Sequence, residues 1–173
     1  MDSILNFWFQ ELEASDWFSS SNDLDVRIKD QFEATYHQVV AGEKAHWRDA
    51  PEGRLAEIIV LDQFSRNMFR GTAASFAADP LALALAQEAV RNGDDRKLEI
   101  EKRVFLYMPY MHSESAKVHE QAMELFRETP NLKYEVKHKA IIDRFGRYPH
   151  RNKALGRKST PEELAWMKEN KGF

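Results

Sequence analysis

Apolar residues recur every three or four positions along nearly the whole chain, and this spacing is the strongest constraint on its fold. Residues three and four apart share one face of an α-helix, so each such run predicts a helix with a buried stripe. The alternation at every second position that is typical of a half-buried strand does not persist long enough to predict a sheet. We therefore expect an all-α fold of eight or nine helices, packed as antiparallel hairpins in a single domain over residues 1-173.

Capping residues, prolines and glycines predict where these helices begin and end. Pro109 is expected to end one helix at Met108, because the residue before a proline avoids helical geometry. Gly146 is expected to end another at Phe145 by adopting a left-handed conformation. The expected helices, with their predicted caps, cover residues 2–12 (Asp2 or Ser3), 21–42 (Ser21 or Asn22), 49–69, 79–93 (Asp79), 97–108, 113–128 (Ser113), 134–145 and a last short helix after the capping box Thr160-Pro161-Glu162-Glu163.

Composition excludes several classes of function. With 43% hydrophobic residues in 173 positions, the chain can bury the core of one globular domain. Its formal net charge of -3 argues against a general nucleic-acid binder, which is normally basic. The absence of cysteine excludes disulfides, thiolate catalysis and cysteine-based zinc sites. Neither a signal peptide nor an apolar run of about 18 residues is present, so we expect a cytoplasmic protein with no membrane partner.

Hydrogen-bond donors gather in the segment 141–152, which reads IIDRFGRYPHRN. The tract from Lys137 to Lys158 carries eight Lys or Arg, and Asp143 is its one acidic residue. The donors of segment 141–152 are Arg144, Arg147, His150, Arg151 and Asn152. After Gly146, Arg147-Tyr148-Pro149 is expected to hold an extended stretch from which His150, Arg151 and Asn152 project. A rigid backbone with several donors is typical of a carboxylate or phosphate clamp.

A second polar group lies in the segment 61–71, which reads LDQFSRNMFRG. Asp62 and Arg66 are one helical turn apart, and Gln63, Asn67 and Arg70 share an adjacent stripe. Interspersed leucine, phenylalanine and methionine leave little of this helix to face water, so part of its polar surface is expected to be buried. A buried guanidinium needs partners or a ligand.

A third polar group follows Pro109 in the segment PYMHSE. It places His112 and Glu114 at the start of the next predicted helix. A helix start favours a negative charge, so Glu114 has a structural interpretation as well as a functional one. His138 falls on an apolar stripe with Tyr134 and Ile141 and is predicted to face the interior as a core histidine.

At these three places the chain resembles the bacterial family known as domain of unknown function 924. The resemblance rests on VLDQFSRNMFRGT with a following FAAD, on FLYMPYMHSE and on HKAIIDRFGRYPHRNKALGRKSTPEE, and it extends over essentially the full length. One departure is that Tyr107 and Tyr110 stand where the family is richer in phenylalanine. The resemblance implies an all-α fold similar to tetratricopeptide-repeat proteins, although the chain shows no 34-residue repeat. It implies no particular activity.

The leading hypothesis is that the three groups form one cleft that binds a small anionic molecule, either a carboxylate or a phosphate. His112, Glu114 and His150 are the candidates for proton transfer. Ser65 and Ser113 are candidate nucleophiles without a recognisable setting, so whether the chain is an enzyme stays open. No cofactor is expected. The candidate ligand-binding residues are Asp62, Arg66, Asn67, Arg70, Arg144, Arg147, Arg151 and Asn152.

Three alternatives remain open. Helical hairpins can form a groove whose arginines bind a protein or peptide partner through acidic or C-terminal carboxylate groups. A metal site is disfavoured, because the histidines do not share a helix face and the arginines repel cations. Finally, the arginines can form structural ion pairs without any ligand. The pairs considered are Arg144 with Asp143 or a distant acid, Arg66 with Asp62, and Arg151 with Glu162 or Glu163.

Overall fold

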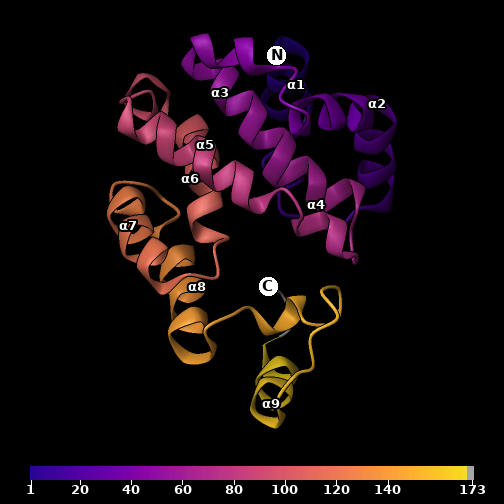
Figure 1. Cartoon of the computed structure of the whole chain (residues 1–173), viewed down its shortest axis with the longest axis vertical. Helices are drawn as coiled ribbons and strands as arrows, with labels where there is room; N and C mark the ends of the chain where they lie inside the picture. Colours follow the sequence, from indigo (N-terminus) through magenta and orange to yellow (C-terminus); the bar gives the residue numbers. More distant parts are fainter. Residues whose placement is uncertain (171–173) are drawn as a thin grey trace.

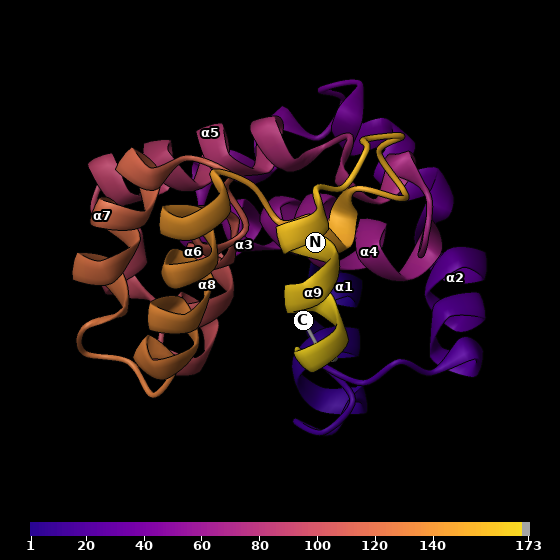
Figure 2. The same ribbon diagram turned by 90° about the horizontal axis from the view of Figure 1, so that it is seen from below.

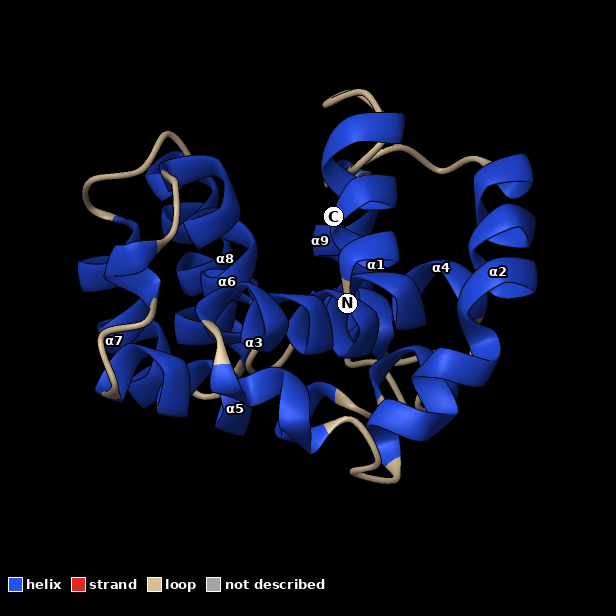
Figure 3. Cartoon of the chain, turned by 90° about the horizontal axis from the view of Figure 1, so that it is seen from above, coloured by secondary structure: helices blue, strands red, loops and turns tan. Residues whose placement is uncertain are grey.

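The computed structural model describes residues 1–170, and every regular element in that range is helical (Figure 3). Two α-helices, Asp2–Asn6 and Pro51–Ile58, run directly into the wider π-helical turns Phe7–Glu11 and Ile59–Phe64, and the second turn continues into the short helix Ser65–Met68. The expected all-α fold is therefore confirmed. The helices are α1 (Asp2–Asn6), α2 (Asn22–Val40), α3 (Pro51–Ile58), α4 (Ser65–Met68), α5 (Asp79–Arg91), α6 (Ile100–Met111), α7 (Ala116–Phe126), α8 (Leu132–Phe145) and α9 (Pro161–Glu169). Short 3-10 turns cover Ala45–Asp49, Ala73–Phe76, Asp95–Lys97 and Pro149–Arg151.

The helices form two groups joined by the long α3 segment and α5 (Figure 1). On one side α2 packs against α4 and the π-helical turn before it, and on the other side α6, α7 and α8 pack in sequence order. Aromatic rings fill the core of the first group, where Phe64 contacts Phe7, Trp8 and Phe32 with centroid separations of 4.8 to 5.9 Å. Edge-to-face and tilted contacts of this kind add to the hydrophobic stabilisation of the core.

The segment after α8 returns toward the first group of helices. Gly146 adopts a left-handed conformation with φ 67°, and the chain then leaves α8 (Figures 1 and 2). Tyr148 anchors the segment, because it is completely buried and its hydroxyl donates to the carbonyl of Met111 at 2.6 Å. Arg151 then reaches Asp79 at the start of α5. Residues from the middle and from the C-terminal part of the sequence therefore meet beside α4 and α6.

Several predicted helix ends are confirmed. The Ser21 side chain caps α2, Gly146 ends α8, and Thr160 with Glu163 forms the predicted capping box of α9. In that box the Thr160 hydroxyl accepts from the Glu163 amide at 3.1 Å, and the Glu163 carboxylate accepts from the Thr160 amide at 2.7 Å. These signals are local, so the sequence alone is sufficient to locate them.

Other predicted ends are wrong. Pro109 lies inside α6, which continues to Met111; residues 104–111 are all buried, so their packing offsets the backbone hydrogen bond that proline cannot make. Asp79 is the first residue of α5 rather than its cap, which is Ala78. Its carboxylate is therefore available to neighbouring arginines. The predicted caps Asp2 and Ser3 lie within α1, and Ser115 rather than Ser113 precedes α7.

Across residues 1–170, no helix combines the length and the apolar character that crossing a lipid bilayer would require.

Candidate functional site

A cavity of about 280 Å³ lies where the end of α4, the end of α6, α8 and the returning segment meet, and we refer to it as the polar pocket. A second cavity, of about 300 Å³, adjoins it and shares Phe76, His112 and Arg151 with it. The polar pocket is lined by Arg66, Arg70, Gly71, Ser75, Phe76, His112, His138, Tyr148, His150 and Arg151. Its walls therefore carry several titratable groups.

A fully buried carboxylate holds one of these histidines. Asp62 lies in the π-helical turn Ile59–Phe64, and its two carboxylate oxygens are 2.8 and 3.0 Å from Nδ1 of His112. The side-chain amide of Gln63 donates to the same carboxylate. Because Nδ1 is engaged, Nε2 is the atom of His112 that a ligand in either cavity can reach. A π-helical turn within an α-helix is often found at a functional site.

Arg66 links two carboxylates next to this pair. Its guanidinium donates to both carboxylate oxygens of Asp79 at 2.9 and 3.0 Å, and it lies 3.2 Å from the carboxylate of Asp62. Burial alone would raise the pKa of Asp62, but the charge of Arg66 and the contacts with His112 and Gln63 hold it below its ordinary value. Asp62 is therefore ionised at neutral pH.

Arg151 is a buried guanidinium with few partners. Its side chain is 7% exposed and lies between two aromatic rings, 4.7 Å from the centroid of Phe76 and 4.6 Å from that of Tyr148. Its one ion pair is a 3.3 Å contact with Asp79, and its Nε has no hydrogen-bond partner among residues 1–170. Burial and the nearby positive charge of Arg66 lower the pKa of Arg151. Arg151 therefore has donor capacity that the described part of the chain leaves unused.

The histidines of the pocket favour their neutral forms. Burial lowers the pKa of His112, and the charge of Arg66 adds to this effect while Asp62 opposes it. Burial also lowers the pKa of His138 to about 3, and its Nδ1 donates to the carbonyl of Tyr134 at 2.8 Å. His150 lies at the exposed rim. With neutral histidines, the charges of Arg66 and Arg151 balance those of Asp62 and Asp79.

The predicted site residues do not all meet at this pocket. Five of them line it, namely Arg66, Arg70, His112, His150 and Arg151, and Asp62 lies directly behind His112. Glu114 lines the adjoining cavity, where it accepts two hydrogen bonds from Arg157 at 2.6 and 2.9 Å and one from the amide of Tyr148 at 2.7 Å. This pairing gives Glu114 a clear structural role.

The other predicted ligand residues lie outside both cavities. Arg144 pairs with Glu162 at the surface, and Arg147 donates to Glu163 at 2.7 and 2.9 Å. Asn152 donates to Ser159 and Glu163, and Asn67 to Asp25, which also pairs with Arg70. These contacts fasten the returning segment to α9 and α4 to α2.

One of the three structural ion pairs considered from the sequence is also wrong. Arg144 pairs with a distant acid, Glu162, which was one of its two alternatives, because Asp143 binds Lys139 one turn away on α8. Arg151 pairs with Asp79 rather than with the acids of α9. The contact of Arg66 with Asp62 is present.

Sequence reasoning missed several residues of the site, among them Phe76, Asp79, His138 and Tyr148. His138 was predicted to be a core histidine. Because the returning segment packs across α8, the His138 ring instead borders the polar pocket, with its centroid 5.7 Å from the centroid of the Tyr148 ring. Asp79 was assigned to capping. In the sequence, Asp79 was marked only by the proline that follows it, and Tyr148 only by its place in the basic tract. Neither signal indicates a pocket.

Within residues 1–170, no group of three or more histidine, cysteine, aspartate and glutamate side chains is arranged to hold a metal ion.

Comparison with known proteins places the chain among relatives of unknown function. A solved structure of a protein of unknown function from Agrobacterium tumefaciens is 36% identical, with a TM-score of 0.93 over 98% of this chain and 97% of that chain. No curated protein matches. The family model described as bacterial protein of unknown function (DUF924) matches residues 4–171. The chain therefore belongs to the DUF924 family of bacterial proteins.

Proposed function

We propose that the polar pocket binds a small anionic molecule, a carboxylate or a phosphate, and that His112 exchanges a proton with it. The observation that carries this proposal is the state of Arg151. A guanidinium that is buried to this extent costs free energy unless its donors are paired. Arg151 has one ion-pair contact, at 3.3 Å, and a buried Nε without a partner within residues 1–170. An anion in the pocket would accept from guanidinium donors of Arg151 that Asp79 does not engage.

The dimensions and enclosure of the pocket favour a small molecule over a peptide. A volume of about 280 Å³ corresponds to roughly nine water molecules at about 30 Å³ each. This is near the lower end of the range for ligand sites. The side chains of Arg66 and Arg151 are 20% and 7% exposed, so they do not form an open basic groove. An acidic peptide would need arginines along an accessible surface.

The charge balance of the pocket links binding to protonation. Because the charges of Arg66 and Arg151 are already matched by Asp62 and Asp79, an added anion brings a net negative charge. Such a charge favours the protonated form of a nearby histidine. His112 is the best placed, since Asp62 fixes its ring and would stabilise the imidazolium. This is the arrangement of a general acid or base held by a carboxylate.

Proton transfer is favoured over covalent catalysis. The hydroxyl of Ser65 is buried and donates to the carbonyl of Leu61 at 2.6 Å, so it is not available as a nucleophile. Ser113 lines the adjoining cavity beside His112, and its hydroxyl oxygen accepts from the amide of Ser115 at 3.3 Å. We therefore propose isomerisation or water activation as the reaction class if the bound molecule is also a substrate.

Calorimetric titration with inorganic phosphate and with malonate tests the proposal. At least one of the two anions should bind, and Arg151→Lys should weaken its binding at least tenfold, because lysine keeps the charge but loses the planar fork. Arg144→Gln is the matched control, since it removes a surface arginine that pairs with Glu162 outside both cavities. The proposal fails if neither anion binds, or if the two variants weaken binding equally.

A further inference from the structure

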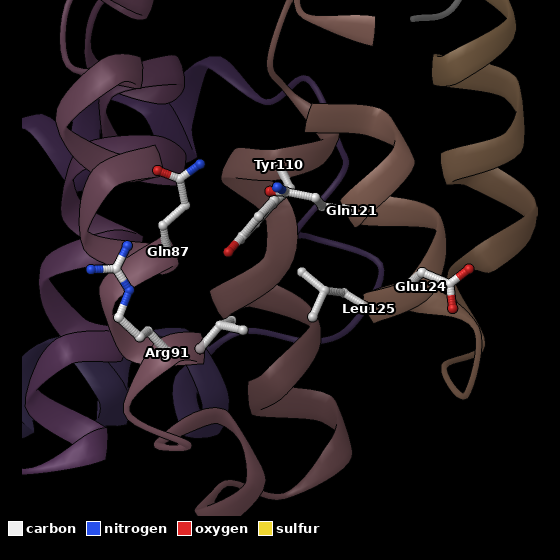
Figure 4. A pocket seen from close by; sticks show the side chains of 7 residues that line it. Gln87, Arg91, Tyr110, Gln121, Glu124 and Leu125 are labelled. Atoms are coloured by element: carbon white, nitrogen blue, oxygen red, sulfur yellow. The ribbon is translucent and has the colours of Figure 1, made fainter. Parts of the chain in front are cut away.

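A third cavity, of about 480 Å³, lies between α5 and α7 with α6 at its base (Figure 4), and we call it the α5–α7 groove. None of its lining residues lines the polar pocket, so the two sites are separate. The groove is lined by Gln87, Val90 and Arg91 of α5, Tyr110 of α6, and Gln121, Glu124 and Leu125 of α7.

Tyr110 forms the base of this groove. Its side chain belongs to the buried core, with 3% of the residue exposed, and its hydroxyl points toward the α5 side of the groove (Figure 4). No hydrogen bond joins this hydroxyl to another group within residues 1–170, and its oxygen is not among the fully buried polar atoms without a partner, so it is open to the groove. The base of the groove therefore holds an unused hydrogen-bonding group.

The α5 wall adds two further donors, the amide of Gln87 and the guanidinium of Arg91 (Figure 4). In the part of the chain that is described, neither side chain has a hydrogen bond or an ion pair with a protein group. Burial and the charge of Asp95 raise the pKa of Tyr110 to about 12, against the effect of Arg91. The phenol is therefore a protonated donor at neutral pH. Three donors on one side of a groove match the two oxygens of a carboxylate.

The rest of the groove limits what can accompany that carboxylate. Val90 and Leu125 provide apolar surface from opposite walls. Glu124 lies on the α7 wall, where its carboxylate pairs with the exposed Arg127. The lining residues of the α7 wall, Gln121, Glu124 and Leu125, include no cation that could bind a second negative group of the ligand. The wall chemistry therefore favours a monocarboxylate with a compact apolar body over a dicarboxylate or a phosphate.

We propose that the α5–α7 groove binds such a monocarboxylate, with its oxygens at Arg91, Tyr110 and Gln87 and its apolar part on Val90 and Leu125. The chemistry fits a free organic acid and equally the last residue of a peptide chain that ends in an aliphatic side chain. This inference does not depend on the function proposed for the polar pocket.

Titration with three small probes tests the ligand class. Isovalerate should bind, its neutral amide isovaleramide should bind at least tenfold more weakly, and acetate should also bind about tenfold more weakly because it lacks the apolar body. Nuclear Overhauser effects from the isovalerate methyl groups to the methyl groups of Leu125 should locate the probe. The inference is overturned if isovalerate does not bind up to 100 mM, on the order of the weakest useful affinity, or if isovaleramide binds equally well.

Variants identify the residues responsible. Arg91→Gln should weaken isovalerate binding about tenfold, and Tyr110→Phe should weaken it about fivefold while keeping the buried ring in place. Arg96→Gln is the matched control, because this arginine is 61% exposed, pairs with Glu128 and lies outside the groove. An affinity that is the same in Arg91→Gln as in the control would refute the assignment. Neither variant should alter phosphate or malonate binding at the polar pocket.

A short peptide that ends in leucine distinguishes the two sources of the carboxylate. If the peptide with a free C-terminus binds at least tenfold more tightly than isovalerate, and its amidated form does not, the natural ligand is a chain terminus. If the peptide binds no better than isovalerate, the natural ligand is a free organic acid. Equal binding of the free and amidated peptides would overturn the role of the carboxylate.

Discussion

Replacing Arg151 by methionine distinguishes a ligand site from a structural ion network. Removing the guanidinium relieves a buried Nε without a partner, a defect that costs about 1–3 kcal/mol. It also removes the electrostatic cost of holding Arg151 near Arg66. Asp79 keeps its two hydrogen bonds from Arg66, so no carboxylate is left unpaired.

The losses on this substitution are small. Stacking of the Arg151 guanidinium between the rings of Phe76 and Tyr148 contributes about 1–2 kcal/mol to stability. A methionine sulfur between the same rings recovers about 0.3–1.5 kcal/mol of it. The 3.3 Å contact with Asp79 adds little more. We therefore expect Arg151→Met to leave the free energy of unfolding unchanged or to raise it by about 1 kcal/mol, while anion binding is lost. For a chain of this length, that corresponds to a rise in Tm of about 0–4 °C.

Arg157→Met is the control with the opposite expectation. Arg157 is a fully paired arginine, with two hydrogen bonds to Glu114 and others to Asn152 and the carbonyl of Tyr148. Its loss should cost about 2 kcal/mol and lower Tm by about 4–8 °C. Scanning calorimetry on both variants gives the answer. If Arg151→Met lowers Tm as much as Arg157→Met does, Arg151 is a structural tie and the proposed anion site loses its main support.

Three further predictions concern separate features of the molecule. Gly53→Ala should destabilise the protein by about 1–2 kcal/mol in urea unfolding, although alanine favours helices, because the new Cβ would lie 1.9 Å from the carbonyl oxygen of Trp47; a stabilised variant would contradict this packing. Anion binding should weaken as pH rises through the range where the complex loses its proton from His112, and titration in buffers of different ionisation enthalpy should show proton uptake that His112→Gln removes. Since the folded pKa of Asp62 is lowered, its contribution to stability is present above the unfolded pKa of about 4 and is lost as the pH falls below that value. Urea unfolding should therefore show a smaller decrease in the free energy of unfolding between about pH 6 and about pH 3 for Asp62→Asn than for the parent chain.

The fold was predictable because its signals are local. Helical spacing, the capping box at Thr160 and the left-handed Gly146 each depend on a few neighbouring residues, and each is present in the structure. Pro109 was misjudged because its effect is set by tertiary packing, which outweighs one lost hydrogen bond in the buried end of α6. The π-helical turn that carries Asp62 leaves the apolar periodicity intact, so the sequence gives no sign of it.

The site was only partly predictable, because ion pairing depends on distant positions. Among the many acidic residues, nothing in the sequence indicates that Arg66 and Arg151 would share Asp79. Richness in donors around residue 147 suggested a clamp there, yet Arg147 is engaged by Glu163. The apolar helix face that carries His138 resembles one that faces the core. The packing of the returning segment decides that the His138 ring borders a cavity instead.

The main hydrophobic core is composed of residues between Ile4 and Phe126, whereas Tyr148 and Arg151 come much later in the chain. A ribosome that has released the core residues has therefore not yet supplied the last wall of the polar pocket. The proposed affinity for an anion would thus be acquired only after Tyr148 and Arg151 have been released. Proteolytic cleavage after Gly146 should abolish the proposed affinity while sparing the main core.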